Sequence, residues 1–206
     1  MSRRPIVLAF AASNNTQSIN RKFVEHAAQV LQEEIAPEVE IETLDLNDYE
    51  MPIYSPDREK TVGIPKEAHA FLNKLGAADG LIISFAEYNG SYTSAFKNIF
   101  DWVSRIEMNI FQGKPMIVLA TSPGRRGGQS VLGTVVSAAP FFGGDIKGSL
   151  SVGPYEEHFN ATTGRLSQPE SALALREALV ELRNSLSASN RVAQSLTFQK
   201  DNSHDN

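Results

Sequence analysis

The chain has 206 residues, slightly more than a typical single domain. Nineteen basic and 24 acidic residues give a net charge of −5 without long blocks of one sign, which argues against a broad electrostatic surface for nucleic acid or anionic lipid. The absence of cysteine excludes disulfides and thiol redox chemistry, so any electron transfer here needs a bound cofactor. The expected partners are small molecules and proteins, with no nucleic acid and no membrane.

The first apolar run, residues 6–12, is too short to cross a bilayer and lacks a convincing signal-peptide cleavage site. No later run reaches the roughly 20 apolar residues that a membrane-spanning helix needs. We interpret the first run as a strand and expect a cytoplasmic protein.

Apolar strands alternate with segments of helical periodicity, which is typical of a parallel sheet covered on both faces. Helices are expected after each strand, the second one ended by Gly76, the third one near Gly113, and the last one beginning after Pro169. We expect one domain over residues 1–187 and a polar, disordered tail over 188–206. The five expected strands are residues 6–11, 39–44, 81–85, 115–121 and 146–152.

Five right-handed βα units predict an α/β fold, a flavodoxin-like three-layer sandwich with a five-stranded parallel sheet of order 2-1-3-4-5. In such a sheet the ligand crevice lies between strands one and three, where the winding reverses. The loops that meet there are residues 12–20, 86–91 and 122–129. A longer proline-containing loop, residues 47–57, is expected to wall one side or to reach a neighbouring subunit.

The first of these loops is dense in neutral hydroxyls and amides and precedes a helix, whose unpaired N–H groups and dipole favour an anion. We interpret it as a phosphate-binding loop, with helix capping as the alternative, although one cap is enough for a helix. The absence of G-x-G-x-x-G and of the Walker lysine pattern favours a mononucleotide. The candidate residues are Ser13, Asn15, Gln17, Ser18, Ile19 and Asn20.

The turn after the third strand joins an apolar strand directly to a helix with apolar residues at helical spacing. Its backbone N–H groups lie at the edge of the sheet where ligands bind, and they suit a flat ring rich in acceptors. The candidate residues in this turn are Ala86, Glu87, Tyr88, Asn89 and Gly90.

These motifs resemble the NADPH-dependent FMN reductase family of flavodoxin-like proteins, which includes related quinone, azo-dye and chromate reductases. In that family the first loop reads roughly G-S-x-R-x-x-S-x-N. Ser13, Ser18 and Asn20 match this pattern, whereas Ala12 replaces its glycine and Asn15 its arginine.

The turn after the third strand is similar to the family's P-E-Y-N-G-S segment, with Ala86 in place of proline. The following helix is similar to its L-K-N and D-W pattern, with Lys97, Asn98, Asp101 and Trp102. Further similar positions are Leu46, Pro52, Tyr54 and Asp57 after the second strand, and Ser122, Gly124, Gly127 and Gly128 after the fourth.

The resemblance implies an enzyme that passes hydride from NADPH or NADH to bound FMN and then to a flavin, quinone, azo compound or similar small-molecule electron acceptor. The FMN phosphate would lie on residues 13–20 and the isoalloxazine ring against residues 86–90, with Ser122 and Gly124 nearby. The flavin carries the chemistry, so no side chain is assigned a catalytic role. The family also implies a homodimer or homotetramer with the site near the subunit seam.

Two other function classes stay open. A flavodoxin-type electron carrier would bind FMN and react with proteins, but such carriers are usually more acidic than −5. A cofactor-free flavodoxin-like interaction module is kept open by the departures at Ala12, Asn15 and Ala86. Arg125 and Arg126 fit equally well a contact to a nicotinamide-nucleotide phosphate or a solvated surface. No metal site is expected, because the four histidines lack H-x-H and H-x-x-H spacing.

Overall fold

The sheet has the predicted architecture. A computed structural model describes residues 3–201, with side chains described for residues 3–187. Five parallel strands follow the order β2-β1-β3-β4-β5, so the predicted order 2-1-3-4-5 is confirmed, and each predicted strand lies within one residue of its observed bounds. These bounds are β1 Ile6–Ala12, β2 Glu40–Leu44, β3 Gly80–Phe85, β4 Pro115–Thr121 and β5 Asp145–Val152.

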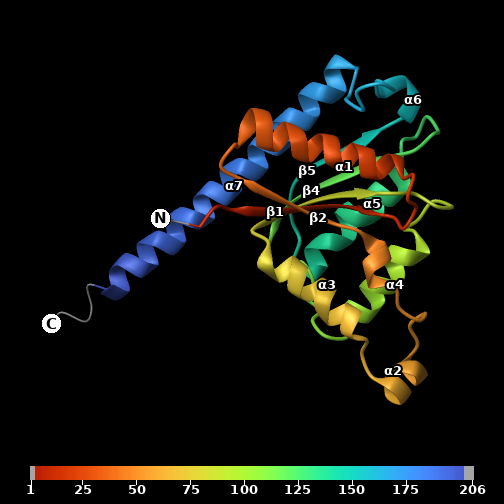
Figure 1. The fold of residues 1–206 in the computed structure, drawn as a ribbon, viewed down its shortest axis with the longest axis vertical. Helices are drawn as coiled ribbons and strands as arrows, with labels where there is room; N and C mark the ends of the chain where they lie inside the picture. Colours follow the sequence, from red (N-terminus) through yellow and green to blue (C-terminus); the bar gives the residue numbers. More distant parts are fainter. Residues whose placement is uncertain (1–2, 202–206) are drawn as a thin grey trace.

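Helices cover both faces of this sheet and make a three-layer sandwich (Figure 1). α1 (Ile19–Val30) and α7 (Pro169–Asp201) pack on one face, and α3 (Lys66–Ala77), α4 (Ser94–Val103) and α5 (Gln129–Ala138) pack on the other. The remaining short elements are η1 Leu31–Ile35, η2 Leu46–Tyr49, α2 Pro56–Val62, η3 Ala139–Phe142 and α6 Tyr155–His158.

The central strands supply two separate hydrophobic cores, because successive strand residues face opposite sides of a sheet. In β1, Leu8 and Phe10 pack with α3, α4 and α5, whereas Val7 and Ala9 pack with α1 and α7. All residues of β3 and β4 are buried, which explains why both strands read as continuous apolar runs. This packing holds the carboxyl ends of the strands at one edge.

One predicted helix end agrees with the structure to within a residue, and one is wrong. α3 ends at Ala77, one residue after the Gly76 that was expected to end it. α4 ends at Val103, far before Gly113, because the chain continues in tight turns. In one of them the N–H of Ile106 donates to the carbonyl of Val103 (3.0 Å).

The segment between β2 and α3, where no helix was expected, contains the helix α2. Ser55 caps this helix by accepting a hydrogen bond from the N–H of Arg58 (3.2 Å), and Pro56 occupies its first turn, where proline is well tolerated. No residue of α2 is buried, so it has no apolar stripe that would reveal it in the sequence.

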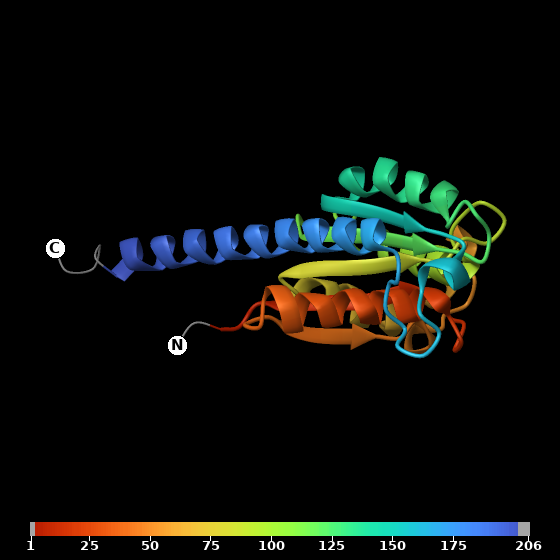
Figure 2. The same cartoon turned by 90° about the horizontal axis from the view of Figure 1, so that it is seen from above.

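α7 begins at Pro169 as predicted and continues to Asp201, past the expected end of the domain at residue 187. Figure 2 shows it extending beyond the sheet on the side where the strands begin. The side chains from 188 onward and all of residues 202–206 lie outside the described residues, so the disordered tail over 188–206 stays a prediction. Within residues 3–201, no helix has the length and apolar character needed to cross a membrane.

Candidate functional site

A cavity of about 210 Å³ lies at the carboxyl ends of β1, β3 and β4. Ten of the thirteen predicted site residues line it, and the other three, Asn89, Gly90 and Gly124, belong to the same loops without lining it. Thr121 and Pro123 also line it and were not predicted, although the end of a predicted strand at this edge is a usable signal. The predicted residues that line the cavity are Ser13, Asn15, Gln17, Ser18, Ile19, Asn20, Ala86, Glu87, Tyr88 and Ser122.

The loop after β1 folds onto itself through its own polar groups. The N–H of Asn15 donates to the hydroxyl of Ser13 (3.2 Å), and the N–H of Gln17 donates to the side-chain oxygen of Asn15 (2.9 Å). Ser18 caps α1 by accepting from the N–H of Arg21 (3.4 Å). The side-chain oxygens thus act as internal acceptors, as the capping interpretation expects.

Other atoms of the same loop remain available as donors. The N–H groups of Ile19 and Asn20 lie in the first turn of α1, where a helix offers them no backbone partner. The hydroxyl hydrogens of Ser13 and Ser18 are not used by the bonds above. The described residues that line the cavity include no Lys or Arg, so the potential that favours an anion comes from neutral donors and the dipole of α1.

Asn20 has a role that the sequence analysis did not predict. Its Oδ1 accepts from the hydroxyl of Ser84 (2.8 Å) and from the N–H of Thr121 (3.0 Å), and its Nδ2 donates to the carbonyl of Thr121 (3.0 Å). The residue is only 2% exposed. Its side chain therefore ties the start of α1 to β3 and to the end of β4, and its backbone N–H is the atom left for a ligand.

The turn after β3 is a two-residue hairpin. Tyr88 and Ser91 exchange backbone hydrogen bonds of 3.0 and 3.2 Å, and the two residues between them, Asn89 and Gly90, have φ values of 53° and 79°. Asn-Gly is the preferred pair for such a turn, because both positions need positive φ. The bonds of the turn leave the N–H groups of Asn89 and Gly90 free.

Glu87 braces this turn against the next helix. Its Oε2 accepts from the N–H of Val131 (2.9 Å), in the first turn of α5. The N-cap position of α5 is Gly128, which has no side chain to cap the helix, so the carboxylate of Glu87 takes over that function from another loop. The turn after β3 and the loop after β4 are thereby held together.

The motif residues of α4 hold the chain after β2. The N–H of Tyr54 donates to Oδ1 of Asn98 (2.8 Å), Nδ2 of Asn98 donates to the carbonyl of Met51 (3.0 Å), and Nε1 of Trp102 donates to the carbonyl of Pro52 (2.7 Å). Trp102 is fully buried. These bonds fix residues 51–54 as one wall of a second cavity of about 260 Å³, which reaches the first loop at Asn14.

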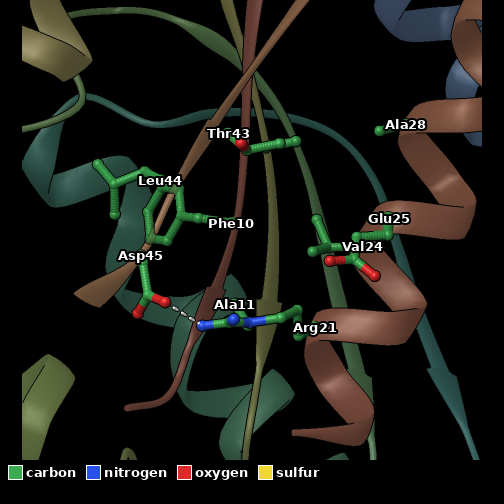
Figure 3. Close-up of a pocket in the computed structure, with 10 residues that line it drawn as sticks. Phe10, Ala11, Arg21, Val24, Glu25, Ala28, Thr43, Leu44 and Asp45 are labelled. Atoms are coloured by element: carbon green, nitrogen blue, oxygen red, sulfur yellow. Dashed lines mark hydrogen bonds and ion pairs between the residues drawn. The ribbon is translucent and has the colours of Figure 1, made fainter. Parts of the chain in front are cut away.

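A third hollow, of about 220 Å³, lies between α1 and the edge strand β2 (Figure 3). Arg21 and Asp45 form an ion pair across it, and Val24 and Leu44 flank it. None of the predicted site residues lines it, so it is separate from the candidate site. Among the residues with described side chains, no group of three or more His, Asp or Glu is placed to hold a metal ion.

Comparisons with known proteins find a matching family model and similar proteins. The family model described as NADPH-dependent FMN reductase matches residues 5–151. A Pseudomonas aeruginosa protein named NAD(P)H-dependent FMN reductase is 32% identical over 121 residues, which cover 59% of this chain and 62% of that protein. A quinone reductase of Escherichia coli is 34% identical over 79 residues, covering 38% and 42%. These two alignments span less than two thirds of the relatives' length.

A solved structure adds the likeness of the whole fold. The flavoenzyme FerB of Paracoccus denitrificans, titled an NAD(P)H:(acceptor) oxidoreductase, superposes with a TM-score of 0.67 at 23% identity, covering 89% of this chain and 98% of that one. An uncharacterized protein of Mycoplasma pneumoniae is 31% identical over 165 residues, covering 78% of this chain and 93% of that protein.

Proposed function

Because the chain belongs to the NADPH-dependent FMN reductase family, we propose that it is an FMN-dependent NAD(P)H oxidoreductase that acts on a small-molecule acceptor such as a flavin, a quinone or an azo compound. One observation carries the proposal: the loops after β1, β3 and β4 line one cavity at the ligand-binding edge of the sheet, and the loop after β1 offers it unpaired neutral donors. The family match favours neither an electron carrier nor a cofactor-free module.

The donor set of this cavity suits FMN. A phosphate monoester accepts hydrogen bonds at three oxygens, and the start of α1 offers the N–H groups of Ile19 and Asn20 with the hydroxyls of Ser13 and Ser18. The open turn at Asn89 and Gly90 offers N–H groups to the polar edge of a flat ring. Arginine at position 15, the family's residue, is therefore not needed for a complete phosphate cradle.

The redox chemistry belongs to FMN, which when bound accepts hydride from NAD(P)H and passes electrons to the acceptor. The protein would position the flavin and polarise the edge of its ring. Asn20 and Glu87 fix the spacing of the three loops, so the donors are in place before a ligand arrives. The N–H groups of Asn89 and Gly90 would stabilise negative charge at the ring edge that they face.

Stopped-flow absorbance tests the proposal. The purified protein, loaded with FMN, is mixed with NADPH or NADH under argon, and the flavin absorbance is followed before and after an acceptor is added. We expect the nucleotide to bleach the flavin absorbance rapidly and a quinone to restore it rapidly. Slow bleaching by both nucleotides would contradict a reductase and would indicate an electron carrier.

We further propose that the protein is a homodimer, or a homotetramer built from such dimers. α2 has no buried residue, its last residue Val62 is 67% exposed, and Ile53 before it is 78% exposed, so a second copy would cover these two apolar side chains next to the cavity at residues 51–54. Sedimentation is expected to give at least a dimer, and a fully active monomer would contradict a shared site. A cytoplasmic location stays a prediction, for cell fractionation to check.

A further inference from the structure

Two arginines beside the cavity have no role in the proposed function so far. Arg125 and Arg126 lie in the loop between β4 and α5, which starts with the cavity-lining residues Ser122 and Pro123. Both arginines are exposed. They are therefore within a few residues of the proposed flavin site and are open to a second ligand that approaches it.

The loop that carries these arginines is held firmly. The hydroxyl of Ser151 donates to the carbonyls of Arg126 (3.2 Å) and Gly127 (3.0 Å), and the N–H of Tyr155 donates to the carbonyl of Ser122 (2.9 Å). A Cβ on Gly127 would lie 2.6 Å from a backbone carbon of Val152, so the two segments touch. The arginines therefore start from a fixed backbone.

Neither arginine forms an ion pair with a described side chain. Among the residues with described side chains, no carboxylate lies within 4.0 Å of either guanidinium, although Glu156 and Glu157 belong to the adjoining α6. Nη2 of Arg126 donates to the hydroxyl of Ser130 (3.1 Å), which leaves its other N–H groups free. By contrast, ion pairs are formed by Arg3, Arg21, Arg105, Arg165 and Arg176.

Arg125 and Arg126 therefore carry two positive charges without an ion-pair partner among the described side chains, at neighbouring positions in a chain of net charge −5, and guanidinium groups bind phosphate through paired hydrogen bonds. The flavin cradle does not use them, because its lining contains no basic side chain. NADPH differs from NADH only by a 2′-phosphate. We propose that Arg125 and Arg126 bind the 2′-phosphate of NADPH and make the enzyme prefer NADPH over NADH. This inference rests on the proposed function and names its electron donor.

The test compares donor preference in the FMN-loaded protein and in four variants: Arg125→Gln, Arg126→Gln, the double variant, and the control Arg4→Gln. Arg4 is also exposed, and it precedes β1 at the opposite end of the sheet. Arg4→Gln therefore removes the same charge far from the cavity. The ratio of kcat/KM for NADPH to that for NADH is measured with a neutral quinone as acceptor. Calorimetry of adenosine 2′,5′-bisphosphate against adenosine 5′-monophosphate gives a readout that does not need turnover.

We expect the unchanged protein and Arg4→Gln to prefer NADPH by at least about tenfold, the size of one charge-assisted hydrogen bond or more. The double variant should lose this preference and the tighter binding of the bisphosphate, while its FMN content stays the same. Added salt should weaken the preference of the unchanged protein.

Three outcomes would overturn the assignment: equal use of NADPH and NADH by the unchanged protein, a preference that survives in the double variant, or an equal loss with both nucleotides. The second of these outcomes has an informative form. If the double variant kept its donor preference but changed its preference for FMN over riboflavin as free acceptor, the arginines would bind the phosphate of the acceptor instead. A protein that takes up no FMN, or is not bleached by either nucleotide, would instead contradict the proposed function.

Discussion

Asn20 shows how far a single residue can be predicted. The sequence places it at the start of a helix beside the ligand crevice, and the structure agrees. Its partners Ser84 and Thr121 are 64 and 101 positions away, and only the register of β3 and β4 brings them to it. The pattern therefore locates the residue near the site but does not reveal that its amide serves as a tie.

Replacing this amide should destabilise the protein and loosen the site together. In Asn20→Ala, buried polar groups of Ser84 and Thr121 lose their partner, and we expect the free energy of unfolding in urea to fall by about 1–3 kcal/mol. FMN affinity should fall as well, because the loops lose their spacing. Asn184→Ala, on the exposed side of α7, is the control; equal stability of the two variants would contradict the tie.

Glu87 provides a second prediction for one side chain. Glu87→Ala removes the cap from the N–H of Val131 and should cost about 0.5–2 kcal/mol, as other caps do. Glu87→Gln keeps an oxygen that can accept this bond, so it should cost less and retain more FMN. Thermal unfolding and flavin content measure both effects. If Gln and Ala behaved alike, the carboxylate would not act through the bond to α5.

At the level of elements, the attachment of residues 51–54 to α4 is open to direct test. Asn98→Ala removes the partner of the Tyr54 N–H and of the Met51 carbonyl, so the segment should detach more often. We expect faster cleavage by protease within residues 51–62 and a raised KM for the acceptor. Asn73→Ala, exposed on α3, is the matched control. Unchanged cleavage in Asn98→Ala would show that these bonds do not hold the segment.

His26 predicts a pH dependence that belongs to the packing of α1. Burial lowers the pKa of His26 below its ordinary 6.5, the positive charge of Arg165 lowers it further, and Glu34 opposes them. The unfolded chain therefore binds the proton first, so the free energy of unfolding should fall as the pH drops below 6.5 and level off below the folded-state pKa. Urea titrations at a series of pH values measure the free energy of unfolding of the unchanged protein and of His26→Gln. If this free energy fell equally steeply with pH in both proteins, the prediction would be contradicted.

Element boundaries were predicted best where burial produces a pattern. The strands β3 and β4 are buried on both faces, and their bounds came within one residue. α2 was missed because it buries nothing, although Ser55 and Pro56 carry a start signal. The end of α4 was placed too late because Ile106 continues the apolar spacing while the backbone has already left the helix.

Across the whole molecule, topology explains most of what the sequence predicted. Alternating strands and helices imply the sheet order, and the order implies which three loops meet. The sequence does not reveal which polar groups of those loops bond to one another and which stay free for a ligand. That division depends on side-chain distances, as in the loop from Ser13 to Ser18, where oxygens are used internally and donors are left open.

The proposed FMN site is a neutral cradle that binds a phosphate without an arginine. The most direct test is a fluorescence titration of the flavin-free protein with FMN, with riboflavin as the ligand that lacks the phosphate. We predict one FMN bound per chain, with riboflavin at least about tenfold weaker because several hydrogen bonds to the phosphate are lost. A protein that stays colourless in excess FMN, or that binds riboflavin equally well, would contradict the account.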